Sequence, residues 1–274
     1  MSEECTHSCE TCSKKGTSCS EKASFLVPAN GQSKIGKVIA VMSGKGGVGK
    51  SLVTELLAVA AARKGKRVAV LDADVTGPSI PTAFGVTEHA VAEDEKTILP
   101  CRSQGGIEIM SLNLLVENPA DPVVWRGPVV AGVVKQFWSD VKWGDIDIMF
   151  VDMPPGTGDV PLTVFQSLPI AGAVVVTSPQ DLVRMIVEKA MRMARMMHVP
   201  VLGLVENMSA FKCPTCGATH PVFGASKVAD VAAAYGVERT VSLPLDPRLA
   251  SLVDEGLVEN ADTSLVDGLV DALL

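Results

Sequence analysis

The sequence has few aromatic residues and no long apolar run, and both absences limit what the protein can be. Aromatic residues make up 4% of the 274 residues, whereas hydrophobic residues make up 47%. The core must therefore be aliphatic, which suits a buried parallel sheet. No apolar run approaches the roughly 20 residues that span a bilayer, and the polar N-terminus lacks the apolar centre of a signal peptide. We expect a cytoplasmic protein without a membrane partner.

An excess of positive charge is also absent. There are 24 Lys and Arg residues against 31 Asp and Glu residues, so the net charge is −7. This balance argues against nucleic acid as a partner. No internal repeat and no second domain appears, and the length suits one large domain. Strands alternate with helices along the chain, which predicts an α/β fold. We expect a doubly wound, mostly parallel sheet flanked by helices over residues 34–274.

One stretch carries most of the information about function. A short apolar run at residues 38–42 predicts a buried strand, and residues 54–64 have helix-forming composition. Between them the pattern G-x-x-x-x-G-K-[ST] predicts a phosphate loop, in which backbone N–H groups and a helix N-terminus hold phosphate. Lys50 would then contact the β- and γ-phosphates, and Ser51 would hold Mg²⁺. The predicted nucleotide-binding residues here are Gly44, Lys45, Gly46, Gly47, Val48, Gly49, Lys50, Ser51 and Leu52.

Carboxylates follow two further predicted strands. Residues 66–71 lead into Asp72 and Asp74, and residues 146–151 lead into Asp152 and a Pro-Pro-Gly-Thr-Gly loop. Carboxyl ends of parallel strands border the ligand crevice of an open α/β sheet. Asp152 has the setting of a Walker B carboxylate near Mg²⁺, and the loop after it suits a switch that senses the γ-phosphate. Simple turns after the strands are the alternative for both segments.

The cysteines form two clusters, and one cysteine stands apart. Residues 1–33 lack periodicity and predict a flexible arm, which contains four thiols spaced C-x3-C-x2-C-x6-C, namely Cys5, Cys9, Cys12 and Cys19. They could hold a 4Fe–4S cluster, hold zinc, or stay unliganded. Cys213 and Cys216 form a C-P-T-C-G motif, which could be half of a zinc site. Across a two-fold dimer the same pair would supply four thiolates, enough for a 4Fe–4S cluster. We assign no role to Cys101.

The motifs together resemble a known family. The extra lysine in K-G-G-V-G-K-S resembles the deviant Walker proteins, which include MinD, ParA and the nitrogenase iron protein. The series KGGVGKS, DADVTGPS, DMPPGTGD, VENMSAFKCPTCG and LPLDPRLA is similar to the Mrp/ApbC family of iron–sulfur cluster carrier ATPases. The resemblance implies that Lys45 acts across a dimer interface on the partner's phosphates. It also implies that Asp72 supports the water shell of Mg²⁺ and that Asp74 orients the attacking water. Asn207 would contact the adenine edge, with Pro244, Leu245 and Asp246 beside the base.

The expected function follows from this resemblance. It implies an ATP-hydrolysing homodimer that uses ATP and Mg²⁺, binds a labile 4Fe–4S cluster through Cys213 and Cys216 of both copies, and delivers it to apoproteins. The predicted catalytic residues are Lys45, Lys50 and Asp74. Two other functions fit parts of the sequence: a MinD/ParA-like positioning ATPase and a zinc-stabilised nucleotide switch. The first of these usually needs a basic face for DNA or a basic amphipathic tail for a membrane.

Overall fold

Eight strands form one central sheet in the order β12-β9-β8-β1-β7-β2-β6-β5. Neighbouring strands are parallel throughout, except that β5 runs antiparallel to β6. The sheet comprises β1 (Lys34–Ser43), β2 (Val68–Asp72), β5 (Cys101–Arg102), β6 (Glu108–Met110), β7 (Asp145–Asp152), β8 (Gly172–Thr177), β9 (Val201–Glu206) and β12 (Thr240–Ser242). The predicted mostly parallel α/β sheet is confirmed.

The structure is a computed structural model and describes residues 25–118, 125 and 127–274. Four of the predicted cluster ligands, Cys5, Cys9, Cys12 and Cys19, lie outside the described residues. Within the described ranges, no helix has both the length and the apolar character needed to cross a membrane.

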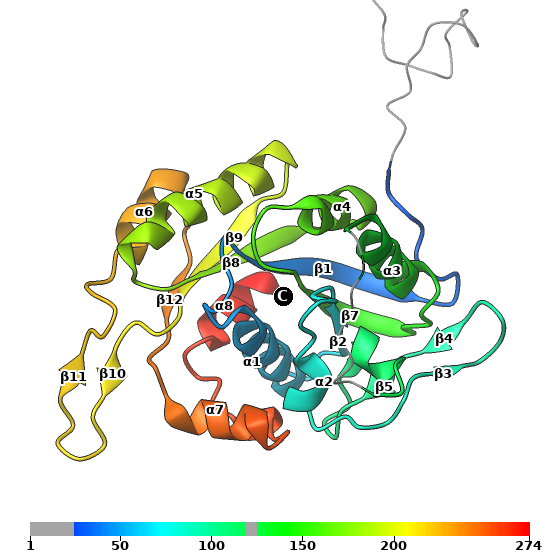
Figure 1. Cartoon of the computed structure of the whole chain (residues 1–274), viewed down its shortest axis with the longest axis horizontal. Helices are drawn as coiled ribbons and strands as arrows, with labels where there is room; N and C mark the ends of the chain where they lie inside the picture. Colours follow the sequence, from blue (N-terminus) through cyan, green and yellow to red (C-terminus); the bar gives the residue numbers. More distant parts are fainter. Residues whose placement is uncertain (1–24, 119–124, 126) are drawn as a thin grey trace, which may run out of the picture.

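Helices cover both faces of the sheet (Figure 1). Alternate residues of β1 show how the core divides: Val38, Ala40 and Met42 belong to one buried cluster, whereas Ile39 and Val41 belong to the other. The first cluster includes side chains of α3 (Gly127–Ser139), α4 (Asp159–Ser167), α5 (Asp181–Met196) and α6 (Val228–Tyr235). The second includes α1 (Lys50–Arg63), α2 (Ile80–Ala83) and α8 (Asp267–Leu273), with α7 (Pro247–Asp254) packed against it. This two-sided packing is what a doubly wound sheet requires.

The order of the strands brings their polar ends together. β1 lies between β7 and β8, and β2 lies on the far side of β7. Because these strands are parallel, the loops after Ser43, Asp72, Asp152 and Thr177 all leave the same edge of the sheet. The residues predicted to bind nucleotide follow these strand ends, so the topology alone gathers them at one edge.

Some elements differ from the sequence-based prediction. α1 begins at Lys50, within the phosphate loop motif, rather than at the predicted residue 54. Three helices were not predicted, namely α2, α4 and α7. Each carries proline in its first turn, at Pro81, Pro161 and Pro247, where the missing N–H costs no helical hydrogen bond. The weakly patterned residues 83–105 contain only β5 and a small hairpin of β3 (Val91–Ala92) and β4 (Ile98–Leu99).

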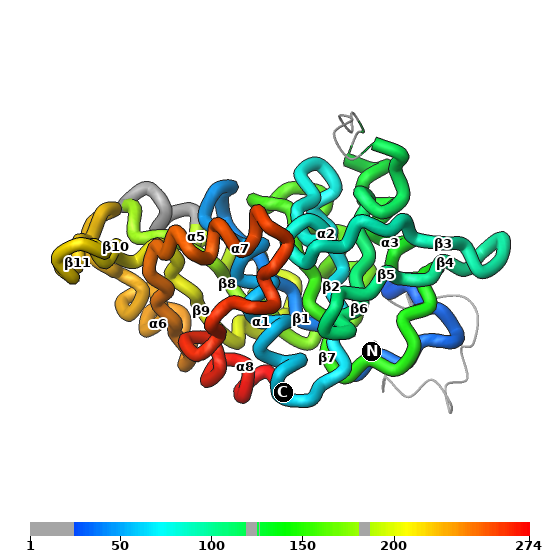
Figure 2. Tube along the Cα trace, turned by 90° about the horizontal axis from the view of Figure 1, so that it is seen from below, coloured from blue at the N-terminus to red at the C-terminus, as the bar shows by residue number. Residues whose placement is uncertain are grey.

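A second small hairpin carries the C-P-T-C-G motif. Its strands are β10 (Phe211–Lys212) and β11 (Thr219–His220), which pair antiparallel. Figures 1 and 2 place this hairpin at one end of the long axis of the molecule, with β3 and β4 at the opposite end. The hairpin projects from the body of the protein, so the two cysteines are carried away from the sheet.

Candidate functional site

The loop between β1 and α1 has the geometry of a phosphate cradle. Gly47 and Gly49 have φ angles of 75° and 77°, in the left-handed region that favours glycine. α1 starts directly after Gly49 and has no acidic residue in its first turn, so its N-terminal N–H groups are available to an anion. The start of the loop is fixed by a hydrogen bond, because Gly156 N–H donates to the carbonyl of Ser43, the last residue of β1, at 2.9 Å. That contact joins the phosphate loop to the predicted switch loop after β7.

Lys50, Ser51 and Asp152 come together at the start of α1. The Lys50 ammonium lies 2.6 Å from Asp152 Oδ2 and 3.8 Å from Asp74 Oδ2. Ser51 Oγ donates to the same Asp152 oxygen at 2.7 Å. The structure therefore unites four residues predicted from three separate motifs. Lys50 and Ser51, the predicted phosphate and Mg²⁺ contacts, both converge on the predicted Walker B carboxylate.

Thr54 is a site residue that the sequence-based prediction missed. Its side chain is fully buried, and its hydroxyl lies 2.7 Å from Asp152 Oδ1. It therefore binds the carboxylate oxygen that Lys50 and Ser51 leave free. A signal existed in the sequence, because Thr54 follows Lys50 by one helical turn and so lies on the same face of α1.

Excess negative charge is buried beside this cluster. Asp72 pairs in register with Asp152 on the adjacent strand and accepts hydrogen bonds from Ser111 Oγ, at 2.9 Å, and from Asp74 N–H, at 3.1 Å. Burial, assisted by the charge of Asp152, raises the pKa of Asp72 to about 8. Burial, with smaller effects from the same two aspartates, also raises the pKa of Glu55 well above its usual value.

The donor set of this cluster fits a divalent cation. Within the described residues, Glu55 Oε2 is buried and has no hydrogen-bond partner. One buried ammonium faces several buried carboxylates, an imbalance that a hard cation with oxygen ligands would correct. The predicted Mg²⁺ residues Ser51, Asp72 and Asp152 lie in this region. Their individual roles toward the metal remain predictions.

Asp74 stands at the more open side of the cluster. Burial raises its pKa, while nearby Lys50 opposes the increase. Asp74 Oδ1 accepts from the Thr76 hydroxyl at 3.3 Å, and its side chain is 15% exposed, against 1% for Asp152, so Asp74 is the more accessible of the two to a ligand. Orientation of the attacking water by Asp74 remains a prediction.

Lys45 contacts its own chain. Its ammonium donates to Gln180 Oε1, and Gln180 is the residue immediately before the first residue of α5. Gln180 was not predicted as part of the site, because it lies after β8 and no motif marks it. The action of Lys45 across a dimer interface remains a prediction.

Asn207 is hydrogen-bonded to the backbone of the phosphate loop. Its side chain is 3% exposed, its Nδ2 donates to the Val48 carbonyl at 3.0 Å, and its Oδ1 accepts from Met208 N–H at 2.9 Å. A Cβ added at Gly49 would lie 2.1 Å from Asn207 Nδ2, so the loop and the amide are in close contact. The predicted contact of Asn207 with adenine remains a prediction.

The other three residues predicted to contact adenine lie between β12 and α7. Pro244 and Asp246 line a cavity of about 390 Å³ between α1, α7 and the segment before α8. Asp246 accepts from Arg248 N–H and so caps α7, and its carboxylate pairs with the Arg248 guanidinium at 2.7 Å. Leu245 N–H donates to the Ala210 carbonyl at 2.8 Å. This loop therefore also borders the segment that leads to the cysteines.

Cys213 and Cys216 lie in the tight turn of the β10–β11 hairpin, and both thiols are free. Hydrogen bonds from the N–H groups of Cys216 and Thr215 to the Cys213 sulfur lower the pKa of Cys213. Gly217, with φ 72°, closes the turn by donating to the Cys213 carbonyl at 2.9 Å. A thiolate that accepts backbone N–H groups is a favourable metal ligand. Among the described residues, no third His, Cys, Asp or Glu side chain is grouped with this pair to hold a metal ion.

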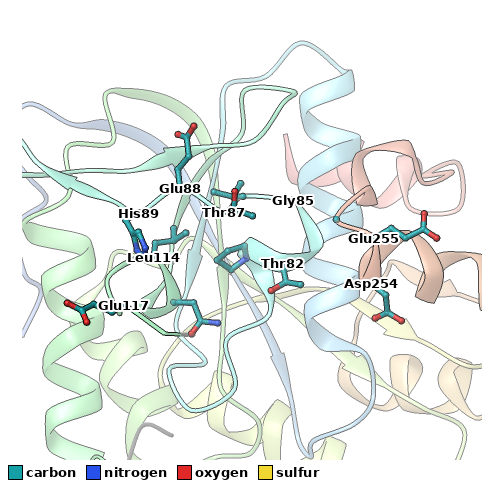
Figure 3. A pocket seen from close by; sticks show the side chains of 13 residues that line it. Thr82, Gly85, Thr87, Glu88, His89, Leu114, Glu117, Asp254 and Glu255 are labelled. Atoms are coloured by element: carbon teal, nitrogen blue, oxygen red, sulfur yellow. The ribbon is translucent and has the colours of Figure 1, made fainter. Parts of the chain in front are cut away.

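A separate cavity does not form a site. It has a volume of about 360 Å³ and lies between α2, the loop after it and the end of α7. Four carboxylates line it, but Figure 3 shows Glu88, Glu117, Asp254 and Glu255 pointing in different directions. Side chains that diverge in this way do not share a ligand.

The fold and the phosphate site define a P-loop NTPase of the MinD/ParA type. MinD of Pyrococcus furiosus has the same fold, with a TM-score of 0.63 at 19% identity over 87% of this chain and 98% of that one. A family model described as the NUBPL iron-transfer P-loop NTPase, in the ParA group, matches residues 34–271. The chain belongs to that family.

Close relatives support the same assignment. Iron-sulfur cluster carrier proteins of Methanocaldococcus jannaschii and Clostridium perfringens are 42% and 43% identical, and the matches cover 93% and 92% of this chain and 89% and 90% of the relatives. The nucleotide-binding protein of Archaeoglobus fulgidus, solved in complex with ADP, is 44% identical with a TM-score of 0.74 over 83% of this chain and 89% of that one. The predicted resemblance to iron–sulfur cluster carrier ATPases is thus confirmed at the level of the family.

Proposed function

We propose that the protein is an ATP-hydrolysing homodimer that binds a labile 4Fe–4S cluster between its two copies and transfers it to apoproteins. One observation carries the proposal: Cys213 and Cys216 form a turn suited to a metal, yet the described part of the chain groups no third ligand with them. Four thiolates hold a 4Fe–4S cluster. A two-fold axis through the paired hairpins would supply the second pair from an identical chain.

The phosphate site supplies the energy-consuming half of this function. Lys50 would exchange its bond with Asp152 for the β- and γ-phosphates of ATP, and Ser51 and Asp152 would then hold Mg²⁺, with Asp72 supporting its water shell. Mg²⁺ would neutralise phosphate charge when bound. Asp74 would orient the attacking water. Each of these residues lies within the cluster at the carboxyl ends of β1, β2 and β7.

Lys45 would link hydrolysis to dimerisation. In the single chain it is bonded to Gln180, so its action on a partner's phosphates requires it to leave that contact. ATP would favour the dimer by offering negative charge to Lys45 of the opposite copy, in the manner of an arginine finger. A dimer that tightens with ATP and relaxes after hydrolysis could then hold the cluster differently in its two states.

Other parts of the proposal rest on sequence alone. Cys5, Cys9, Cys12 and Cys19 would hold a second cluster or zinc. The acidic composition favours apoproteins and assembly factors over nucleic acid as partners. We place the protein in the cytoplasm, where free thiols persist.

The test is cluster transfer by the purified full chain under anaerobic conditions. After reconstitution with iron and sulfide, we expect a broad absorbance near about 400 nm, typical of iron–sulfur chemistry, and a dimeric mass. The Cys213→Ala, Cys216→Ala double variant should transfer no cluster to an apo-ferredoxin, whereas the Cys101→Ala control should transfer it normally. The control is apt because Cys101 is a buried thiol on β5.

Two results would contradict the proposal. Wild-type transfer by the double variant would exclude the hairpin as the cluster site. A colourless protein that retains zinc after reconstitution would favour the nucleotide switch, because Cys213 and Cys216 also suit zinc. A positioning ATPase would instead bind DNA or vesicles in the presence of ATP.

A further inference from the structure

The segment between β9 and the cysteines is hydrogen-bonded to the phosphate loop, to the end of β8 and to the residue before Pro244. At its start, Asn207 N–H donates to the Thr177 carbonyl at 2.8 Å, and Asn207 Nδ2 donates to the Val48 carbonyl at 3.0 Å. Further along, Ser209 donates to the Leu243 carbonyl through both its N–H and its hydroxyl, each at 2.9 Å. Only five residues, 208–212, separate Asn207 from Cys213, so the first thiol lies a short length of chain from a residue that contacts the phosphate loop.

The contact of Asn207 with the phosphate loop leaves little room for the Asn207 side chain to move independently of the loop. Gly49 has φ 77°, and a Cβ there would lie 2.1 Å from Asn207 Nδ2. On the other side of the amide, Asn207 Oδ1 accepts from Met208 N–H, and Met208 has a φ angle of 58°, in the left-handed region. Such a conformation is strained for a residue other than glycine and persists only where its surroundings fix it. The amide therefore connects the loop conformation to the backbone conformation at the start of the segment.

We infer that Asn207 is a positioning residue that couples the state of the phosphate loop to the geometry of Cys213 and Cys216. When the loop closes on phosphate, the Val48 carbonyl and the Gly49 backbone must move together with the amide they contact. The Asn207 amide then shifts residues 208–212, which lie immediately before Cys213, the first of the two thiols. This inference rests on the proposed function, since it names the residue through which nucleotide and cluster would communicate. Packed elements with few alternatives transmit small shifts in this way.

This role differs from recognition of adenine. In the structure both ends of the amide are already bonded to backbone, the nitrogen to Val48 and the oxygen to Met208. A residue that recognises the base would affect binding of ADP much more than binding of GDP. A residue that positions the loop would affect both nucleotides alike, because their phosphates are identical.

The variant Asn207→Asp isolates the contact. Aspartate keeps an oxygen that can accept from Met208 N–H, but it replaces the N–H donor that faces the Val48 carbonyl with another acceptor. Asn30→Asp is a matched control. Asn30 also accepts a backbone N–H two residues on, from Gln32 at 2.9 Å, and donates Nδ2 to a distant carbonyl, that of Asp140 at 3.4 Å. Asn30 lies before β1, away from the nucleotide site.

The readout is the alkylation rate of the hairpin thiols in the metal-free full chain. Trypsin cleaves after Lys212 and Lys227, so Cys213 and Cys216 fall on one peptide without other cysteines, and Cys101 falls on residues 97–102 as an internal reference. Rates are measured by mass spectrometry without nucleotide and with Mg²⁺ and ADP or GDP, each at about twenty times the dissociation constant measured for that variant. Because no iron is used, this experiment can fail while cluster transfer succeeds, and the reverse.

We expect nucleotide to change the hairpin alkylation rate of the wild type and of Asn30→Asp by about fivefold or more, the usual lower range of coupling between sites. In Asn207→Asp, and in Asn207→Ala as a second variant, the change should fall below about twofold with both nucleotides, while the Cys101 rate stays constant. The inference is overturned if the wild type shows no nucleotide dependence, or if both variants keep it. A folded variant that binds no nucleotide, or one that loses affinity for ADP alone, would assign Asn207 to binding and would also overturn it.

Discussion

Replacement of Thr54 by valine tests how the Walker B carboxylate is held. Valine has nearly the shape of threonine, so the substitution removes a hydroxyl without opening a cavity in a fully buried position. The Thr54 hydroxyl lies 2.7 Å from Asp152 Oδ1 and 3.1 Å from the Lys50 carbonyl. With one hydrogen to donate, it serves the nearer and charged acceptor. The variant therefore leaves one oxygen of a buried carboxylate without that donor.

The size of the effect follows from the kind of bond that is lost. A hydrogen bond to a charged group contributes about 1.5–3 kcal/mol, so we expect Thr54→Val to lower the free energy of unfolding by about 2 kcal/mol. The control, Thr54→Ser, keeps the hydroxyl and loses one buried methyl group, at a cost of about 1 kcal/mol. With a urea m-value of about 3 kcal/mol/M, the midpoint for Thr54→Val should fall by roughly 0.7 M.

The assay is equilibrium unfolding in urea without nucleotide, followed by far-ultraviolet circular dichroism. Thr54→Val removes the hydroxyl and keeps the methyl group, whereas Thr54→Ser does the reverse. The order of their two unfolding midpoints therefore shows which group contributes more to stability. If Thr54→Ser were as destabilising as Thr54→Val or more so, packing of the methyl group would outweigh the hydrogen bond. The proposed role of Thr54 in holding Asp152 would then be wrong.

Three further predictions address the dimer, the charge cluster and the backbone. Gln180→Ala removes the partner that holds Lys45 within its own chain; since a bond to a charged group contributes about 1.5 kcal/mol and a symmetric dimer breaks one such bond in each copy, ATP-dependent dimerisation measured by light scattering should strengthen roughly a hundredfold, and an unchanged dimerisation constant would show that the contact does not compete. Because burial raises the pKa of Asp72 to about 8, its contribution to stability is present below the unfolded pKa of about 3.9 and is lost as pH rises through about 8. The melting temperature should therefore fall between about pH 5 and about pH 8, level off above that, and fall less with Mg²⁺ and ADP; Asp72→Asn should reduce the fall and leave the part that comes from Glu55, whose pKa is also raised, and a fall of unchanged size would show that Asp72 does not contribute. Gly85→Ala should lower the free energy of unfolding by about 2 kcal/mol, because φ is +65° and a Cβ would lie 2.7 Å from a backbone oxygen of the segment after α7; Gly65→Ala, with φ +77° and open space around it, should cost less.

Much of the fold was predictable because the strands are apolar. The runs at β1, β2, β7 and β8 are almost wholly buried, and continuous burial is what gives a parallel strand its sequence signal. α7 shows the opposite case. None of its residues is fully buried, so its apolar pattern is weak. Its first residue is proline, which gives a further reason why the sequence did not indicate a helix. No helix was predicted here, and only the three residues before it, Pro244, Leu245 and Asp246, were assigned to contact with adenine.

The site was predictable where one motif determines one local geometry. Gly49, Lys50 and Ser51 could be assigned to a phosphate loop from the strand, loop and helix that surround them in the sequence. Gln180 could not be assigned, because its partner Lys45 lies in a distant part of the chain. Thr54 had one signal, its spacing of one helical turn from Lys50, but its bond to the distant Asp152 could not be read from the sequence. Contact of Asn207 with a base was predicted from a family resemblance and stays a prediction, whereas its hydrogen bonds to the backbone of Val48 and Met208 were not predicted. A tertiary contact between a loop and a strand end has no periodicity to reveal it.

The thiol hairpin has a consequence for how the protein could acquire its cargo. Two strands of two residues each provide almost no stability of their own in water, and the Leu245–Ala210 hydrogen bond ties the hairpin base to the ATPase body. A metal centre bound at the turn would therefore order a structure that is marginal without it. By the same linkage, any change that loosens the base of the hairpin would weaken the binding of such a metal centre. Release of the cargo would then need only local melting of a few residues, with the sheet and its helices left undisturbed.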